Sequence, residues 1–171
     1  SRFKPNGEPD PFSALGTNVI DGKLGPGGKP CAEEPASCDK TPQGIVIDAE
    51  IAVQEQVAIA PPGAASGTGG DIYVSDAGHH VVHVFGSSGK FLGLLSKYKE
   101  GTEKTFGEVY GVAVNSEGTV YVGDFSRQRV HEYVPTANPP LNTDNTANFA
   151  EVERPGALVA GTGPSAGFIF V

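Results

Sequence analysis

Short apolar runs bounded by glycine recur along the chain at a fixed spacing. Residues 70–76 (GDIYVSD) return 48 positions later as residues 118–124 (GTVYVGD), and a third copy opens at residues 167–171 (GFIFV). The match extends beyond the shared aspartate, since Val82-His83 recurs as Val130-His131. A repeat of this length predicts stacked copies of one supersecondary unit, because a single unit cannot bury its apolar face alone.

Each full copy is predicted to contain four short strands. The apolar runs are rich in β-branched and aromatic residues and are bounded by Gly, Asn, Asp and Ser, as is typical of strands. They span residues 57–60, 72–74, 81–85 and 91–95 in the first copy, and 112–114, 120–122, 130–133 and the neighbourhood of 136–141 in the second. Two more strands are expected at 157–159 and 168–171, and no long amphipathic helix is indicated.

The repeat divides the chain into five parts. Half a unit comes first, because Phe3 and Gly7 precede Phe85 and Gly89 by the same 82 positions. The expected parts are 1–20 (third and fourth strands of a half unit), 21–56 (a Gly/Pro-rich insertion with a cysteine pair), 57–100 and 101–150 (full units), and 151–171 (first and second strands of another half unit). The chain contains no Met and ends inside a strand pattern, so we expect it to be a piece of a longer protein.

Both full copies resemble the NHL repeat, a blade motif of β-propellers. That motif places hydrophobic-Tyr-Val-x-Asp after an inner strand and a Gly, followed by a short loop, an Asn-x-Arg-Ile/Val segment, an aromatic residue and a glycine turn. Residues 72–76 and 120–124 match its first part, and Arg129-Val130 matches its Arg-Ile/Val pair. The chain departs from the motif at the Asn position, which holds His79 in the first copy and Arg127 in the second.

The resemblance implies an all-β fold of β-propeller blades, each with four antiparallel strands. Rings of this type have about six blades and would need roughly 290 residues, whereas this chain supplies about three blades. An open arc exposes two strand edges that can pair with another chain. Two solutions follow: further sequence completes the ring, or two copies pair head to tail, each outgoing half blade joining the incoming half blade of its partner.

Composition narrows the classes of partner and compartment. The net charge is −8 and no run of Lys and Arg occurs, so nucleic acid is not an expected partner. No apolar stretch approaches the ~18 residues of a membrane span. Cys31 and Cys38 are the only cysteines, and we expect a disulfide rather than two free thiols. A disulfide predicts a secreted or cell-surface protein.

Strand alternation predicts one loop-rich end. If the four strands of a unit run up and down, the loops at 77–80 and 125–128, the cysteine insertion and the long connections 96–110 and 135–155 emerge on the same end. Binding residues gather on such loops of a rigid scaffold. The binding candidates are therefore His79, His80, Phe125, Arg127 and Gln128.

The repeated charged residues have a structural interpretation. Asp76 and Asp124 lie at a strand-to-loop junction, where a carboxylate accepts backbone N–H groups and holds the loop, and Arg129 is expected to brace its blade. The side chains of His79 and His80 diverge in an extended backbone and do not share a metal easily. We assign no metal ligand; calcium in the acidic insertion and a metal or proton-transfer role for one histidine stay open as alternatives.

The favoured function is that of an extracellular NHL-type scaffold, which binds a protein, a glycan or further copies of itself through its loop-rich face. The resemblance leaves two alternatives, because fold does not determine function. One is a propeller-type lyase or lactonase with a metal or histidine at the channel mouth; the other is a structural subunit of a surface fibre. The inner runs at 57–60, 112–114 and 158–159 offer almost no polar ligands, which favours a non-enzyme without a cofactor.

Overall fold

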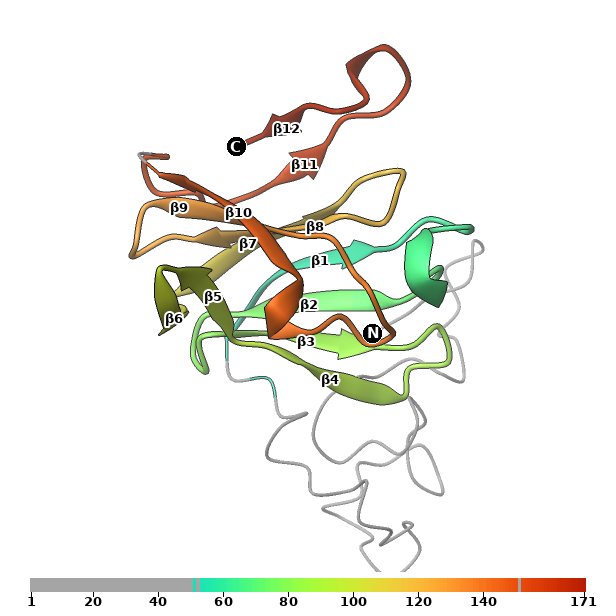
Figure 1. Ribbon diagram of the computed structural model, residues 1–171, viewed down its shortest axis with the longest axis horizontal. Helices are drawn as coiled ribbons and strands as arrows, with labels where there is room; N and C mark the ends of the chain where they lie inside the picture. The colour runs from blue at the N-terminus through green and yellow to red at the C-terminus, as the bar shows by residue number, and fades with distance from the viewer. Residues whose placement is uncertain (1–50, 52, 151) are drawn as a thin grey trace, which may run out of the picture.

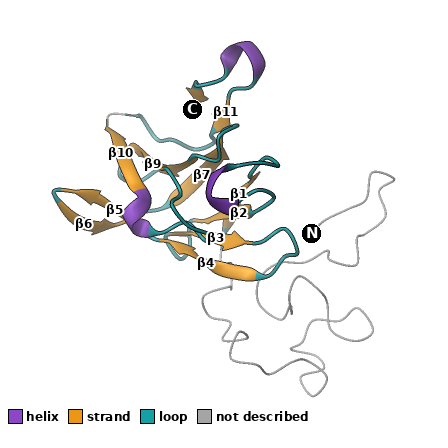
Figure 2. Cartoon of the chain, turned by 45° about the vertical axis from the view of Figure 1, so that its right-hand side comes forward, coloured by secondary structure: helices purple, strands orange, loops and turns teal. Residues whose placement is uncertain are grey.

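The computed structural model describes residues 51, 53–150 and 152–171. This part of the chain is all-β, with three 3₁₀ turns as its helical content (Figures 1 and 2). These turns are η4 (Ala65–Gly67), η5 (Asn142–Asp144) and η6 (Gly163–Ser165). The predicted half unit at 1–20 and the Cys31–Cys38 pair lie outside the described residues.

Two four-stranded antiparallel sheets follow one another along the chain. The first has the order β1-β2-β3-β4 and the second the order β10-β9-β8-β7, so both are simple meanders. Their strands are β1 (Gln54–Ile59), β2 (Ile72–Asp76), β3 (Val81–Phe85) and β4 (Phe91–Leu95), then β7 (Val109–Val114), β8 (Val120–Asp124), β9 (Arg129–Tyr133) and β10 (Asn145–Ala150). The repeat is kept in the pairing register, since Ile72 pairs with Phe85 as Val120 pairs with Tyr133. The predicted four-stranded antiparallel units are confirmed.

The outer strand of the second sheet differs from the prediction. It is β10 at 145–150, and residues 136–141 form a loop instead. Pro139 and Pro140 have no N–H for a β-ladder, so the chain cannot pair there. The buried carboxylate of Asp144 closes this loop by accepting the Leu141 N–H at 2.8 Å and the Thr136 hydroxyl at 2.6 Å.

A hairpin between the two sheets was not predicted. It consists of β5 (Lys97–Glu100) and β6 (Thr102–Thr105), joined at Gly101, whose φ of +70° suits glycine. Its strands are mostly polar, so no apolar alternation marks them in the sequence. Tyr98 supplies its anchor, because this buried ring stacks on His131 of the second sheet with centroids 4.1 Å apart.

The inner strands lie side by side. β1 runs along β7, and β11 (Val159–Ala160) follows on the far side of β7, where it pairs with β12 (Ile169–Phe170) (Figure 1). β11 and β12 form a two-stranded antiparallel sheet at the place where the repeat predicts the strands of a third unit. The described sheets do not close into a ring.

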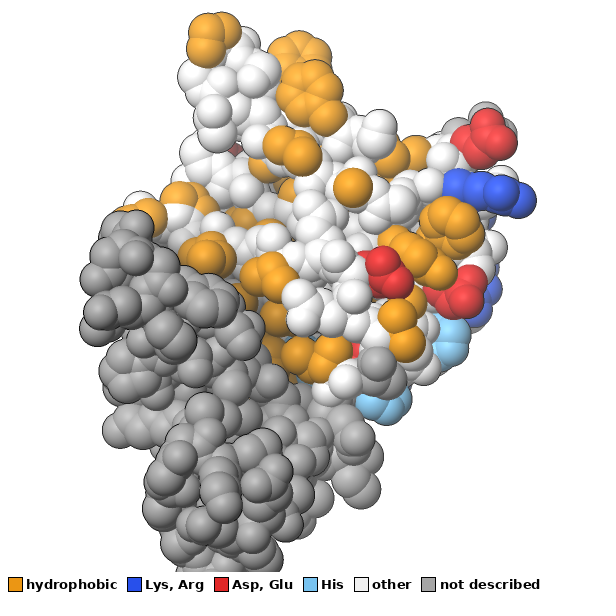
Figure 3. All heavy atoms as spheres, turned by 180° about the vertical axis from the view of Figure 1, so that it is seen from behind, with side chains coloured by type: hydrophobic (Ala, Val, Ile, Leu, Met, Phe, Trp, Pro, Cys, Tyr) orange, Lys and Arg blue, Asp and Glu red, His pale blue; other side chains and the backbone are white. Residues whose placement is uncertain are grey.

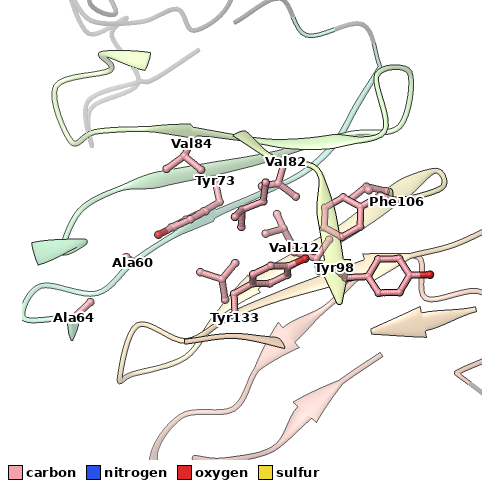
Figure 4. Close-up of a cluster of buried hydrophobic side chains, with 13 residues drawn as sticks. Ala60, Ala64, Tyr73, Val82, Val84, Tyr98, Phe106, Val112 and Tyr133 are labelled. Carbon is pink, nitrogen blue, oxygen red and sulfur yellow. The ribbon is translucent and has the colours of Figure 1, made fainter. Parts of the chain in front are cut away.

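Each sheet buries the same face against the next one. Tyr73 and Val82 of the first sheet pack against Val112 and Tyr133 of the second (Figure 4). Their repeat-equivalents Tyr121 and Val130 pack in turn against Leu158, which precedes β11. The same sheet-on-sheet contact therefore occurs twice. Burial of apolar area in these contacts contributes about 25 cal/mol per Å² to the free energy of unfolding and is the main source of stability.

Hydrogen bonds between inner strands add to this packing. The carboxamide of Gln56 on β1 donates from Nε2 to the Leu158 carbonyl at 2.7 Å. Its Oε1 accepts the N–H of Leu158 at 2.9 Å and that of Val112 at 3.2 Å. One side chain therefore joins all three units. Ser75 makes a second bridge by donating to the carbonyl of Tyr110 at 2.7 Å.

Replacement of Gln56 by Ala is expected to lower the free energy of unfolding by about 2–3 kcal/mol, because three backbone groups lose their partner. Gln54→Ala is the matched control, since Gln54 is an exposed residue of the same strand and its loss should cost under about 0.5 kcal/mol. Urea unfolding followed by circular dichroism measures both. Equal midpoints for the two variants would show that the bridge contributes nothing.

Asp71 makes stability depend on pH. It is 3% exposed at the end of the β1–β2 loop, and burial raises its pKa to about 6 against the opposing hydrogen bond from Asn138. The folded protein therefore takes up this proton more readily than the unfolded chain, and stability increases as the pH falls from about 6 to about 4. Asp71→Asn should raise stability by about 2 kcal/mol at pH 7.5 and have little effect below pH ~4. Urea titrations across this range measure the difference; a difference that does not change with pH would contradict the assignment.

Candidate functional site

Three loops meet at one end of the two sheets. The β2–β3 loop (77–80), the β8–β9 loop (125–128) and the connection that carries the β5–β6 hairpin line an open cavity of about 380 Å³. Its lining includes His79, His80, Ser96, Thr105, Phe106 and Arg127. Three of the five predicted binding residues, His79, His80 and Arg127, are thus brought together. Figure 3 shows exposed histidine side chains near acidic and basic ones at one margin of the molecule.

The other two predicted binding residues lie outside this cavity. Phe125 packs against Tyr110 with ring centroids 4.5 Å apart, and the guanidinium of Arg154 lies 5.9 Å from its ring centre. Gln128 is an exposed turn residue with φ of 55°, and its carbonyl accepts the N–H of Val152 at 3.2 Å. Both residues shape the connection to β11 rather than the cavity.

The expected position of the connection 135–155 is wrong in part. Residues 135–144 lie at the opposite end of the sheets, where the carbonyl of Pro135 accepts the Ser66 hydroxyl at 2.6 Å and Asn138 donates to Gly67 at 2.8 Å. Only the segment after β10 returns to the loop-rich end. The displaced outer strand explains the error, since the chain crosses the sheet at 145–150 rather than at 136–141.

Asp76 organises the first of the two loops. Its carboxylate is fully buried, and Oδ1 accepts the backbone N–H groups of Val53 at 3.0 Å, Gly78 at 3.0 Å and His79 at 3.2 Å. The second oxygen, Oδ2, faces two imidazoles: Nδ1 of His79 at 2.8 Å and Nε2 of His83 at 3.1 Å. His83 is 1% exposed and lies beside the rings of Phe85 and Phe91.

Asp124 occupies the same place in the second sheet. Its buried carboxylate accepts the N–H of Gly107 at 2.8 Å and that of Arg127 at 3.2 Å. The side chains that face Oδ2 differ from those at Asp76, because Nε of Arg127 lies 3.7 Å and Nε2 of His131 lies 3.5 Å from this oxygen. Nδ1 of His131 instead meets Oδ1 of Asn148 at 2.7 Å. The two aspartates thus hold equivalent loops, but one faces two imidazoles and the other an imidazole and a guanidinium.

Arg129 connects its sheet to the hairpin. Its guanidinium pairs with the carboxylate of Glu100 at 2.7 Å, and Lys104 pairs with the same carboxylate at 2.8 Å. Hydrogen bonds from Lys104 and Arg129 hold the pKa of Glu100 below its ordinary value. This arrangement places the hairpin against one wall of the cavity, since Thr105 at the end of β6 lines it.

In the sequence His79 stands next to His80, whereas in the structure His79 lies together with Asp76 and His83. The tight β2–β3 turn produces this grouping. Asp76 pairs with Val81 across the turn, and the chain reverses at His80, which has a left-handed backbone conformation with φ of 60°. The spacing Asp-x-x-His-x-x-x-His across a predicted hairpin is the signal that could have revealed it.

Comparison with known proteins adds no relative: no protein-family model and no curated protein matches the chain. Among the described residues, no helix has the length and apolar character needed to cross a membrane.

Proposed function

We propose that the protein is an extracellular NHL-type β-propeller scaffold of the six-bladed type, which assembles by strand addition and binds a protein or glycan through its loop-rich end. The observation that carries this proposal is the exposed apolar face of β11 and β12. β11 and β12 continue the repeat, yet they expose the surfaces that the first two units bury.

The exposed face is identified by the repeat. Phe170 pairs with Val159 as Tyr121 pairs with Ala113 and as Tyr73 pairs with Ala58. Tyr73 and Tyr121 are 0% and 9% exposed because a further unit covers them, whereas Phe170 is 53% exposed. Hydrophobic side chains are visible on the segment with β11 and β12, which projects at the top of Figure 3. This face matches the surface that receives the next blade.

The open edge supports the same proposal. β2 pairs with β3, and β8 pairs with β9, on the side away from the inner strand. In the part of the chain described here, β12 has no such neighbour, and beside it lies an apolar groove of about 340 Å³. Its lining is mostly apolar and includes Tyr121, Val130, Phe149, Phe168, Ile169 and Val171, with Glu132 as a charged member. A third strand added to β12 would fill it.

A second copy of this chain is the occupant that we propose. Residues 1–20 carry the sequence pattern of third and fourth strands, which are the two strands that β11 and β12 need. Head-to-tail exchange of these halves would give two chains of three blades each. The loop-rich end would then repeat around one face of the ring and provide several equivalent binding positions.

The enzyme alternative has less support. A lyase or lactonase site at the channel mouth would need polar ligands converging from separate inner strands. β7 presents Val, Tyr, Gly and Ala, and the candidate ligands Asp76, His79 and His83 all belong to one sheet. The assignment to a secreted or cell-surface location depends on the cysteine pair and stays a prediction.

Light scattering coupled to size exclusion should give about twice the chain mass of 17.6 kDa. The double variant Phe168→Lys/Val171→Lys is expected to shift the protein to the monomer, because two charges would have to be buried in the groove. Leu141→Lys is the control, since this residue is 47% exposed at the opposite end of the sheets. A wild-type protein that is monomeric at every concentration would rule out pairing between copies and leave completion by further sequence.

A further inference from the structure

Three side chains at the β2–β3 turn form a group of metal-ligand type. Asp76, His79 and His83 each offer one ligand atom, and these atoms lie within 4.8 Å of one another. The separations from Oδ2 of Asp76 are 2.8 Å to Nδ1 of His79 and 3.1 Å to Nε2 of His83. Ligands at Zn–N and Zn–O distances of ~2.0–2.1 Å in a tetrahedron lie about 3.3 Å apart, and the two separations from Asp76 are within about 0.5 Å of that spacing.

We propose that Asp76, His79 and His83 bind one Zn²⁺ ion at the loop-rich end. This site is independent of the assembly proposed above. Two imidazoles and one carboxylate are a donor set that Zn²⁺ favours, and three protein ligands leave a fourth position for water.

The surroundings hold two of the three ligands in place. Oδ1 of Asp76 accepts three backbone N–H groups, which fix the carboxylate and direct Oδ2 toward the imidazoles. Hydrogen-bonded carboxylates of this kind orient the ligands of metal sites. The ring of His83 is held by Phe85 and Phe91, at centroid distances of 6.2 and 6.3 Å.

The second unit provides an internal comparison. Position 127, equivalent to position 79, holds an arginine whose permanent charge lies 3.7 Å from the buried Asp124 carboxylate. A guanidinium compensates a buried carboxylate but does not bind metal, whereas an imidazole binds metal. The first unit therefore has a potential metal ligand at the position where the second unit has a fixed cation.

The cavity makes the fourth position accessible. The side chain of His79 is 41% exposed and lines the 380 Å³ cavity, while Asp76 and His83 are buried behind it. Arg127 lines the same cavity. A ligand that replaces the zinc-bound water would enter from this side, and Arg127 favours an anionic one.

The test uses the full chain stripped of metal with a chelator and titrated with Zn²⁺ in a calorimeter. Because cysteine thiolates also bind zinc, the titration is repeated in a Cys31→Ser/Cys38→Ser background. We expect one Zn²⁺ per chain in both backgrounds. Co²⁺ should bind at the same stoichiometry and give the absorption of a tetrahedral N/O site.

His79→Arg is the decisive variant, because it copies the second unit and places a guanidinium beside Asp76 in place of the imidazole. It should weaken Zn²⁺ binding by about 100-fold or more while leaving the circular dichroism spectrum unchanged. Glu117→Ala, which removes an exposed carboxylate in the β7–β8 turn, should leave binding as it is. Arg127→His should add a second, weaker equivalent of Zn²⁺ by recreating the ligand set beside Asp124 and His131.

Two outcomes would overturn the proposal. One is the absence of stoichiometric Zn²⁺ binding in the cysteine-free background; the other is a His79→Arg variant that binds Zn²⁺ as tightly as its parent. If His79→Arg unfolds the protein, His79→Gln serves in its place, since it removes the imidazole without adding charge.

Discussion

The arrangement of this protein depends on the contact between successive inner strands. β1, β7 and the segment before β11 lie close enough for the carboxamide of Gln56 to reach backbone groups of both neighbours. A close approach of this kind requires small residues where the inner strands meet. Gly111 satisfies this requirement, since an added Cβ would lie 2.8 Å from the side chain of Leu158. Hydrogen bonds set the register between units, and the apolar faces on either side supply most of the free energy.

A contact that is repeated by translation along the sequence has no natural end. The face of one sheet covers the back of the next, so the last unit always presents an uncovered face and an unpaired edge. Among the described residues, the uncovered surfaces at this end include Phe170, Val159 and the outer edge of β12. Propeller rings solve this problem by closure, and the proposed pairing of half units is one route to such closure.

The same repeat also allows chemical variation at a fixed position. Asp76 and Asp124 perform the same structural task, because each accepts backbone N–H groups and stabilises a loop. The residue beside the buried carboxylate nevertheless differs between the units, with an imidazole at position 79 and a guanidinium at position 127. Substitution at residue 79 or 127 can therefore alter the chemistry of the loop-rich end without altering the sheets beneath it.

The sequence by itself determined the repeat, the strand type and the two four-stranded units, because alternating apolar residues and glycine turns are local signals. It did not reveal the β5–β6 hairpin, whose strands are polar and are anchored by the single ring of Tyr98, or the bridge made by Gln56, whose partners lie 56 and 102 residues away. The place of β10 depended on which segment could satisfy a β-ladder, and the proline-rich segment predicted for it could not. The grouping of Asp76, His79 and His83 was likewise decided by tertiary structure, because the tight turn between β2 and β3 controls which side chains converge on the buried carboxylate.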